Sequence, residues 1–375
     1  MMNKKVGIVC YPTVGGSGVV ATELGINLAE KGYEVHFIST TMPFRLKRLY
    51  ANIYFHEVEV ANYPVFKHPP YDLSLANKIA EVIDREELDI IHAHYAMPHA
   101  ICSIIAKQMA KREVKIVTTL HGTDITVLGI DQSLQNMICF AIEESDGVTA
   151  VSESLRKQTK EVFNTEKPIE VIHNFIDQVD PSIESPSRLK ENLGILPEEK
   201  VIIHISNFRK VKRVEDVIQS FFLIQKKVPS KLLLVGDGPE YSNMRSLIRE
   251  LGLDDQVIFM GRQDNIQDLL TISDLKLLLS EKESFGLVLL EAMAQGIPSI
   301  GTNIGGIPEV IQDGKNGYIC SLGDVDDIAN KAINLLNDDK LWKDFSTHAK
   351  SYVTENFDSK TIVKQYEELY DGLFT

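Results

Sequence analysis

The stretch Lys5–Ser39, KVGIVCYPTVGGSGVVATELGINLAEKGYEVHFIS, decides how this chain folds. It begins with the apolar run Lys5–Cys10 and ends with a second apolar run at Glu34–Ser39, each typical of a buried strand. Between them, a glycine-rich loop leads into a helical pattern over Ala21–Lys31. Because two parallel strands need a crossover connection, this strand–helix–strand order predicts a parallel pair.

The same alternation continues along the rest of the chain. Further strands are predicted at Asp89–His92, Lys115–Thr118, Gly147–Ala150, Ile169–Ile172, Val201–Ile205, Lys231–Val235, Val257–Met260, Leu275–Leu279, Ser299–Ile300 and Gly317–Cys320. Helices are predicted between them, for example over Leu73–Glu86, His99–Ala110 and Val214–Val228. Strands that alternate with helices predict parallel sheets with helices on both faces.

At 375 residues, the chain is long enough for two domains. The alternation lapses over residues 174–187, which are rich in Asp, Ser and Pro, and we interpret this stretch as a linker. Residues 1–173 and 188–356 are then two α/β domains with doubly wound sheets. If the two sheets face each other, a ligand cleft lies between them, since ligands bind beyond the carboxyl ends of parallel strands. Residues 357–375 are predicted to form a final helix, with one apolar side made by Ile362, Tyr366, Leu369 and Phe374.

The composition excludes several classes of protein. Lys and Arg number 39 against 53 Asp and Glu, and the net charge of −14 disfavours a general nucleic-acid or anionic-membrane binder. No run approaches the about 18 apolar residues of a membrane span, and the N-terminal apolar run is too short for a signal peptide. The four cysteines are scattered, which favours reduced thiols and a cytoplasmic protein.

The loop Val14–Gly18 follows the first strand and opens a helix. Its glycines allow a ligand to approach the backbone, and free N–H groups at a helix start bind anions. Gly16-x-Gly18-x-x-Ala21 also matches a dinucleotide fingerprint, but the acidic residue expected about 20 residues later is missing from His36–Thr41. A nicotinamide or flavin enzyme is therefore disfavoured, and a merely permissive turn remains the alternative.

A basic loop, Ser206–Arg213, follows the first strand of the second domain. It contains Arg209, Lys210, Lys212 and Arg213. Cations grouped at the carboxyl end of a strand, in an acidic protein, predict a pocket for a diphosphate or a carboxylate. A solvated run of charges is the alternative.

Two glutamates, Glu283 and Glu291, flank a further glycine. If Ser284 caps a helix that Gly286 begins, both carboxylates lie on the same side of it. In this interpretation Phe285 and Gly286 offer exposed backbone N–H groups, and the residues packed inward are Leu287, Leu290 and Ala294. Carboxylates at this spacing suit the vicinal hydroxyls of a sugar, and a buried salt bridge to a basic side chain is the alternative.

The segment Glu283–Pro298 resembles the E-x7-E signature of the retaining family-4 glycosyltransferases, which have two facing Rossmann-like domains, the GT-B fold. Other blocks match the same family in order, at Gly15–Gly16, Val235–Pro239, Gly305–Glu309 and Asp313–Gly317. The resemblance covers essentially the whole chain. It implies a metal-independent transferase without a cofactor, a donor-binding second domain, an acceptor-binding first domain and a C-terminal helix that returns to the first domain.

Four further blocks resemble one subgroup of that family, which transfers N-acetylglucosamine from UDP-N-acetylglucosamine (UDP-GlcNAc) to L-malate as the first step of bacillithiol biosynthesis. The blocks are Cys10–Gly18, His92–Pro98, Thr119–Asp124 and Ser206–Arg213. The resemblance implies an α product formed with retention, with the leaving phosphate accepting the proton of the acceptor.

The resemblance also implies the site residues. The catalytic ones would be Glu283, Lys212 and His121, whose backbone carbonyl would face the anomeric carbon. The nucleotide-sugar site would comprise Gly15, Gly16, Asn207, Arg209, Lys212, Gly236, Arg262, Glu283, Phe285, Gly286 and Glu291. Many relatives have Gly-Arg where this chain has Ser206-Asn207, so Arg209 is expected to replace the usual diphosphate arginine. The acceptor candidates are Ser17, Tyr95, Thr119, Thr123 and Asn174, with Arg45 or Lys67 as the cation.

Three alternatives stay open at this point. The chain could be another retaining transferase that uses a UDP- or ADP-sugar and a different small acceptor, a nucleotide-sugar epimerase, or a catalytically silent sensor. A metal site is disfavoured because no carboxylate cluster accompanies the histidines His92, His94, His99 and His121. The sequence does not decide whether the chain forms a homo-oligomer.

Overall fold

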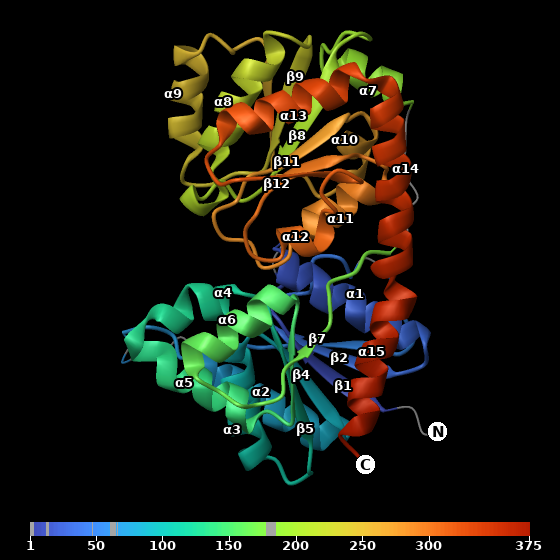
Figure 1. Cartoon of the computed structure of the whole chain (residues 1–375). Helices are drawn as coiled ribbons and strands as arrows, with labels where there is room; N and C mark the ends of the chain where they lie inside the picture. Colours follow the sequence, from blue (N-terminus) through green and yellow to red (C-terminus); the bar gives the residue numbers. More distant parts are fainter. Residues whose placement is uncertain (1–3, 13–14, 47, 61–64, 66, 178–184) are drawn as a thin grey trace. The chain divides into compact units, whose positions relative to one another are not determined.

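The computed structural model describes residues 4–12, 15–46, 48–60, 65, 67–177 and 185–375. The chain divides into two compact units. Unit 1 comprises Met1–Phe175 and Ser359–Thr375, and unit 2 comprises Ile176–Asp358. Each unit is built on one parallel sheet covered by helices (Figure 1). The centre of the expected linker, residues 178–184, lies outside the described residues.

Unit 1 contains a seven-stranded sheet in the order β3-β2-β1-β4-β5-β6-β7. The strands are β1 Lys5–Val9, β2 Glu34–Ser39, β3 Ile53–Glu57, β4 Ile90–His94, β5 Lys115–Leu120, β6 Gly147–Ala150 and β7 Glu170–Val171. In the centre of the sheet, Val6 of β1 pairs with Val35 of β2 and with Ile90 of β4, all in parallel register. The strand-to-strand order 3-2-1-4-5-6 is that of a doubly wound nucleotide-binding fold.

Helices cover both faces of this sheet (Figure 1). Helices α1 Gly16–Glu30 and α15 Ser359–Gly372 contact each other and close one core over β1 and β4. Helices α2 Tyr71–Glu86, α3 Ile101–Met109 and α5 Gln132–Glu144 pack in sequence with one another on the other side. The remaining helices of this unit are η1 Ala96–Ala100, α4 Thr123–Thr126, η2 Leu128–Ile130 and α6 Glu153–Phe163.

The last helix, α15, therefore belongs to the unit formed by the start of the chain. Ile362, Tyr366 and Leu369 lie in the core of unit 1, as their helical spacing predicted. The prediction that Phe374 shares this side is wrong, since its side chain is 50% exposed. The helix ends at Gly372, so the helical phase is lost, and the ring of Phe374 instead lies under the ammonium of Lys4, 4.7 Å from the ring centroid.

Unit 2 contains a six-stranded parallel sheet in the order β10-β9-β8-β11-β12-β13. The strands are β8 Lys200–Ile205, β9 Ser230–Val235, β10 Val257–Gly261, β11 Leu275–Leu278, β12 Ser299–Thr302 and β13 Gly317–Cys320. The helices are α7 Pro186–Asn192, η3 Lys210–Lys212, α8 Val214–Gln225, α9 Tyr241–Glu250, α10 Gln267–Thr271, α11 Leu287–Ala294, α12 Ile307–Val310, α13 Val325–Asn337 and α14 Asp339–Asn356. One face packs against α8, α9 and α13, and the other against α7, α10 and α11.

Both sheets reverse their strand order at one point, between β1 and β4 in unit 1 and between β8 and β11 in unit 2. The loops that leave these neighbouring strands run to opposite faces, so a crevice opens at the carboxyl ends of the strands. Ligand-binding residues are therefore expected in the loops after β1 and β4, and after β8 and β11.

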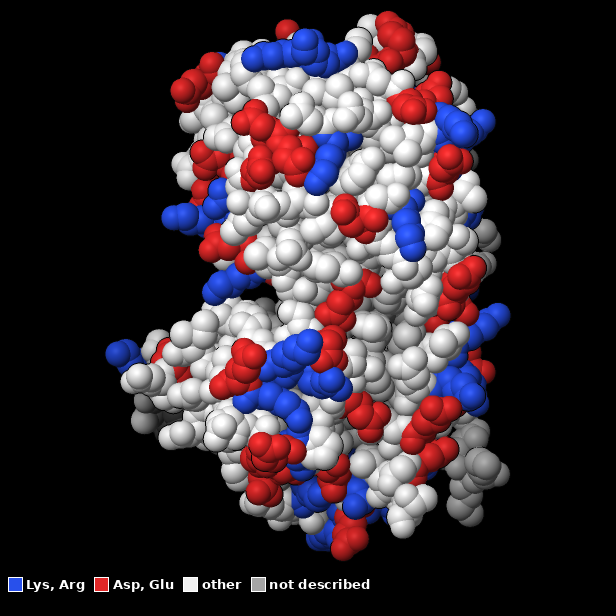
Figure 2. All heavy atoms as spheres, in the orientation of Figure 1, with Lys and Arg blue, Asp and Glu red and all other residues white. Residues whose placement is uncertain are grey.

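Two structural observations concern the nucleic-acid binders and the membrane-spanning proteins, which the composition disfavours. On the face drawn in Figure 2, acidic and basic side chains are interspersed rather than gathered into one basic field. Among the described residues, no helix is both long enough and apolar enough to cross a membrane.

Candidate functional site

In unit 2, the loops after β8 and β11 meet at the point where the strand order reverses. Lys212 Nζ donates a hydrogen bond to Glu283 Oε2 across 2.7 Å, and the two side chains are only 20% and 16% exposed. The N–H of Glu281 also donates to the carbonyl of Val211 at 2.8 Å, so the backbones of the two loops are joined as well. A cation and a carboxylate, both predicted as site residues, therefore stand together where a doubly wound sheet binds its ligand.

The loop that carries Glu283 is held by the glycine pair that follows β12. The N–H of Gly306 donates to the carbonyl of Glu283 at 3.1 Å. Gly305 has a φ of +57°, and a Cβ atom there would lie 1.8 Å from the same carbonyl oxygen. Both glycines are required by close backbone approach, which explains the Gly305–Gly306 pair in physical terms.

We expect Gly305→Ala to lower the free energy of unfolding of unit 2 by about 1–3 kcal/mol more than Gly314→Ala. Gly314 has a φ of +72° but nothing within 4 Å of its Cβ position, so the control retains the backbone strain and omits the clash. Urea unfolding of both variants measures the difference. Equal losses would mean that the Glu283 loop yields freely to the added methyl group.

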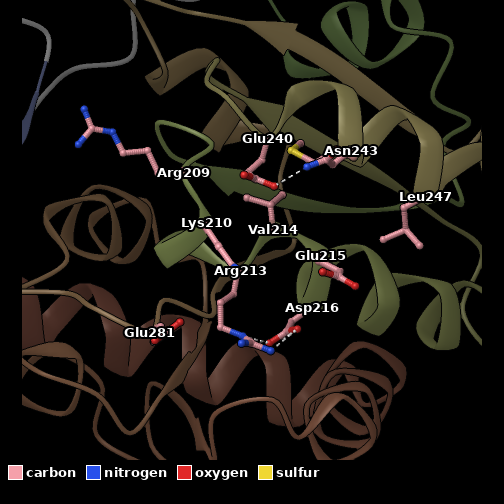
Figure 3. A pocket seen from close by; sticks show the side chains of 11 residues that line it. Arg209, Lys210, Arg213, Val214, Glu215, Asp216, Glu240, Asn243, Leu247 and Glu281 are labelled. Carbon is pink, nitrogen blue, oxygen red and sulfur yellow. Dashed lines mark hydrogen bonds and ion pairs between the residues drawn. The ribbon is translucent and has the colours of Figure 1, made fainter.

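The cations of the basic loop divide into two groups: Arg209, Lys210 and Arg213 line one pocket, whereas Lys212 pairs with Glu283. Arg213 is engaged by Asp216, with Nε–Oδ2 and Nη2–Oδ1 distances of 2.6 and 2.9 Å. Arg209 is exposed and points away from this pair (Figure 3). The reason is local, because Arg213 has a φ of +45° as the residue before α8 and turns its side chain back onto the first turn of that helix.

A pocket of about 290 Å³ lies beside the basic loop, between α8 and α9 (Figure 3). Its walls carry both signs of charge: Arg209, Lys210 and Arg213 face Glu215, Asp216, Glu240 and Glu281. Glu283 and Glu291 are not among its lining residues. A diphosphate would meet four carboxylates there, so we do not assign this pocket to the predicted diphosphate site.

The helix that carries the second glutamate differs from the sequence prediction. It begins at Leu287, after Gly286 with a φ of +91°, and no side chain caps it, so the prediction of Ser284 as the cap is wrong. Phe285 is not exposed either, since it is 1% exposed and packs edge-on against Phe357 at 5.7 Å. The left-handed turn at Gly286 separates Phe285 from the helix and lets its ring enter the core.

Glu291 itself is buried in α11, with 6% of its surface exposed. The residues that pack inward around it are Leu289, Leu290, Ala292 and Met293, whereas Leu287 and Ala294, predicted to pack inward, are only half-buried. At about 100° per residue, Leu287 and Ala294 lie on the side of the helix opposite to the buried Leu289 and Met293.

Lys276, which was not predicted as a site residue from the sequence, lies in β11 beneath this helix. Its side chain is fully buried, and its Nζ has no hydrogen-bond partner among the described residues. Burial lowers the pKa of Lys276 to about 7, against the opposing influence of the Glu291 and Glu283 carboxylates. The signal in the sequence is a single lysine inside the apolar strand Leu275–Leu279.

In unit 1, the loops after β4 and β5 are joined by a buried carboxylate. Asp124 accepts hydrogen bonds from the N–H groups of Ala96 at 3.0 Å and Gly122 at 2.9 Å. Burial raises the pKa of Asp124 to about 6. Beside this link, His121 Nε2 lies 2.9 Å from His94 Nδ1, and the ring of Tyr95 lies 5.2 Å from that of His121. The predicted residues Tyr95 and His121 are thus brought together.

The histidines of this region are neutral at pH 7. Burial lowers the pKa of His92 and of His121 to about 3 and that of His99 to about 4. His92 lies between the hydroxyls of Tyr370 at 2.6 Å and Thr119 at 2.7 Å, which ties α15 to the sheet. In the described part of the chain, no group of three or more His, Cys, Asp or Glu residues could hold a metal ion.

The other predicted donor residues lie at loop ends. Gly15 precedes α1 and Gly16 begins it, and both are exposed, whereas Val14 lies outside the described residues. Asn207 is exposed. Gly236 has a φ of +127°, and a Cβ there would lie 1.9 Å from the carbonyl oxygen of Ser206. The Arg262 side chain is 79% exposed, with its Nε 3.8 Å from Asp237 Oδ2.

The acceptor candidates differ in how exposed they are and in whether their polar groups are already engaged. Thr119 is fully buried, and its hydroxyl lies 2.7 Å from both His92 Nε2 and Thr149 Oγ1, so its side chain belongs to the core. Arg45 is paired with Glu23 at 3.1 Å. The remaining candidates are Ser17, half-buried, Thr123 and Lys67, both exposed, and Asn174, buried with its Oδ1 unpartnered among the described residues.

Comparison with known proteins places this geometry in a family. The family model "Glycosyltransferase Family 4" matches residues 14–179, and "Glycosyl transferases group 1" matches residues 187–352. The chain is 58% identical over 369 residues to the N-acetyl-alpha-D-glucosaminyl L-malate synthase of Bacillus anthracis, covering 98% of this chain and 97% of that protein.

Solved structures show the same fold at lower identity. Anabaena HepE in complex with UDP and glucose superimposes with a TM-score of 0.83 at 22% identity, over 98% of this chain and 100% of that one. A glycosyltransferase from Rickettsia africae gives a TM-score of 0.82 at 22% identity over 100% of both chains. The chain therefore belongs to the family-4 glycosyltransferases, with the GT-B fold of two Rossmann-like domains.

Proposed function

We propose that this protein transfers N-acetylglucosamine from UDP-GlcNAc to the hydroxyl of L-malate, with retention of the α configuration. The observation that carries the proposal is the Lys212–Glu283 pair at the carboxyl edge of the unit 2 sheet, within the segment that bears the E-x7-E pattern. The 58% identity to a synthase named for this product supports the choice of substrates. This reaction would supply the first intermediate of bacillithiol.

On the donor side, Glu291 would accept the ribose hydroxyls, and Glu283 with the Phe285 and Gly286 backbone would meet the hexose. Lys212, already drawn to Glu283 at 2.7 Å, would lie between that carboxylate and the diphosphate. Negative charge grows on the leaving phosphate in the transition state, so a preorganised cation accelerates the reaction most there. Among the described residues that line the neighbouring pocket, no ion pair joins Arg209 to a carboxylate, whereas Arg213 is paired with Asp216. Arg209, Gly15 and Gly16 are the other members of the proposed diphosphate site. We propose that these groups make a metal ion unnecessary.

On the acceptor side, the neutral side chain of His121 limits which group can take the proton of the acceptor hydroxyl. An imidazole with a pKa of about 3 is a very weak base, so it is poorly suited to take the proton of the acceptor hydroxyl. The Glu283 carboxylate is already engaged by the Lys212 ammonium at 2.7 Å, so it is not placed to act as that base either. Both facts favour the route in which the leaving phosphate takes the proton of the acceptor hydroxyl.

The acceptor carboxylates would need donors and a cation. Ser17, Tyr95, Thr123 and Asn174 remain candidates for hydrogen bonds, and Thr119 does not, because its hydroxyl is enclosed. Of the two cations, Lys67 is favoured, since Arg45 would first have to leave Glu23. We also propose that the protein acts in the cytoplasm on these two small-molecule substrates, and that it binds neither nucleic acid nor a membrane surface.

A product assay tests the function directly. The protein is incubated with UDP-GlcNAc and, separately, L-malate, inositol phosphate, glucose phosphate or no acceptor. We expect UDP release and an α-anomeric glycoside by proton NMR with malate only. Turnover with a different acceptor would overturn the malate assignment and keep the transferase. An isomerised sugar nucleotide in the arm without acceptor would indicate an epimerase, and no product in any arm would favour a sensor.

A further inference from the structure

Lys276 occupies a place in the sheet that an apolar residue would normally fill. It pairs with Ile203 of β8 and Ser299 of β12, so β11 has a strand on either side of it. Its register partner Ile203 packs in the core with Ala292 of α11 and Ile297. A lysine in such a position is rare, because burial of an amine in apolar surroundings is costly.

No compensating hydrogen bond explains the lysine. Within the described residues, neither Lys276 Nζ nor the hydroxyl of its cross-strand partner Ser299 has a hydrogen-bond partner. A lysine kept for stability would be paired, and methionine would fill the same space without an unsatisfied group. Two adjacent unsatisfied polar groups under α11 therefore indicate a role other than packing.

The groups around Lys276 are those of the proposed donor site. Glu291 of α11 and Glu283 of the loop after β11 favour the ammonium, and Lys212 of η3 opposes it. His204 of β8 also lies within electrostatic reach, but burial lowers its pKa to about 3, so it is neutral at pH 7. With its own pKa lowered to about 7, Lys276 is divided between its two protonation states near neutral pH.

We propose that Lys276 is a positioning residue of the donor site, whose buried ammonium beneath α11 attracts the carboxylate of Glu291 and which takes up a proton when the donor diphosphate binds. The inference rests on the proposed function. In the free protein, the Lys212 ammonium is paired with the Glu283 carboxylate. A diphosphate adds two negative charges beside Lys212, so the balance of charge around Lys276 shifts toward the ammonium. The neutral amine then gains one proton from the solvent, and no bond to the donor is formed.

The wild-type protein offers the first test. UDP-GlcNAc is titrated calorimetrically without malate, at pH 7.5, in buffers of different ionisation enthalpy. This donor has no group that titrates near neutral pH, so any proton uptake belongs to the protein. We expect uptake of roughly half a proton, and an affinity that falls by up to about tenfold per pH unit as the pH rises above 7, because the deprotonated free form must first be protonated.

A pair of variants provides the second test. Lys276→Met removes the charge. Lys231→Met is the control, since Lys231 lies near the start of β9, which β8 separates from β11, and its Nζ donates to the Asp255 carbonyl and lies 3.6 Å from Glu199 Oε1. We expect Lys276→Met to weaken UDP-GlcNAc binding about tenfold at pH 6.5, to abolish proton uptake, and to raise KM more than it lowers kcat. Its melting temperature should not fall. Lys231→Met should keep the wild-type affinity and proton uptake.

The outcomes separate the two proposals. If wild-type protein binds UDP-GlcNAc without proton uptake, or if Lys276→Met retains the wild-type pH dependence, the role of Lys276 is refuted and the function stands. If the folded wild-type protein does not bind UDP-GlcNAc at all, the donor assignment fails and this inference fails with it. Should Lys276→Met not fold, the proton count of the wild-type protein still decides.

Discussion

Replacing Lys212 by methionine is expected to lower kcat/KM for the transfer reaction by about 100-fold to 1000-fold, the loss typical of removing one preorganised group that stabilises transition-state charge. Lys212 is the cation nearest the predicted sugar-binding carboxylate, 2.7 Å from Glu283 Oε2. Without it, the developing charge on the leaving phosphate loses its partner, and Glu283 is left as a half-buried carboxylate with no cation.

The matched control for this variant is Lys210→Met. Lys210 begins the same short helix η3 but lines the neighbouring pocket of mixed charge, so its loss should change kcat/KM by less than about threefold. Glu283→Gln and the double variant complete a cycle. If Lys212 serves only to neutralise Glu283, the double variant will recover most of the activity; if Lys212 stabilises the diphosphate, as we propose, the double variant will be at least as impaired as Lys212→Met.

The second large effect is a loss of stability in mild acid. Burial lowers the pKa of the four histidines in β4 and in the loops after β4 and β5: His92 and His121 to about 3, His99 to about 4, and His94 well below its ordinary value. The pKa values of His36 and His56, also in unit 1, are lowered by burial in the same direction. The unfolded chain binds protons on these groups below pH about 6.5 and the folded chain does not, so stability is present above pH 6.5 and is lost as the pH falls.

One buried group acts in the opposite direction. Burial raises the pKa of Asp124 to about 6, so below that pH the folded chain binds its proton first and gains stability. Each histidine contributes about 1.4 kcal/mol per pH unit, and four histidines outweigh one aspartate. We expect the free energy of unfolding of unit 1 to fall by at least about 3 kcal/mol between pH 6.5 and 5.5, equivalent to about 6–12 °C in Tm.

Thermal unfolding followed by circular dichroism at pH 7.5, 6.5 and 5.5 measures this slope. His99→Gln should make the slope shallower, because one titrating group is removed, whereas His68→Gln, at an exposed position, should leave it unchanged. A Tm that stays constant from pH 7.5 to 5.5 would mean that the histidines take up protons without unfolding the unit.

The fold was largely predictable from the sequence, and the reason lies in the type of sheet. Strands that are covered on both faces, such as β1 and β8, are continuous apolar runs and are easily found. Strand β3, Ile53–Glu57, was missed because it lies at an edge and is only half-buried, so its residues IYFHE carry no such run. Cap residues and the last turn of α15 depend on single backbone angles, and the predictions for Ser284 and Phe374 failed there.

The candidate site was predictable as a set of loops and less so as a set of contacts. The glutamates were found by spacing, and a salt bridge was kept as the alternative to a sugar. Glu283 does pair with a cation, Lys212, which lies 71 residues away in the sequence. Nothing in the basic loop distinguishes Lys212 from Arg213, whose partner Asp216 depends on a left-handed turn. The burial of Lys276 was not predicted, because a single lysine in a strand is ordinarily exposed.

The return of α15 to unit 1 has a consequence for synthesis on the ribosome. Tyr366 and Tyr370 are fully buried in unit 1, and Tyr370 is the hydroxyl partner of His92. Until residue 372 has emerged, one face of the first sheet lacks the part of its cover that α15 provides, whereas unit 2 is complete at Asp358. The half of the molecule that is translated first is therefore the last to close, and a nascent chain stalled between these points would expose an aggregation-prone surface to chaperones.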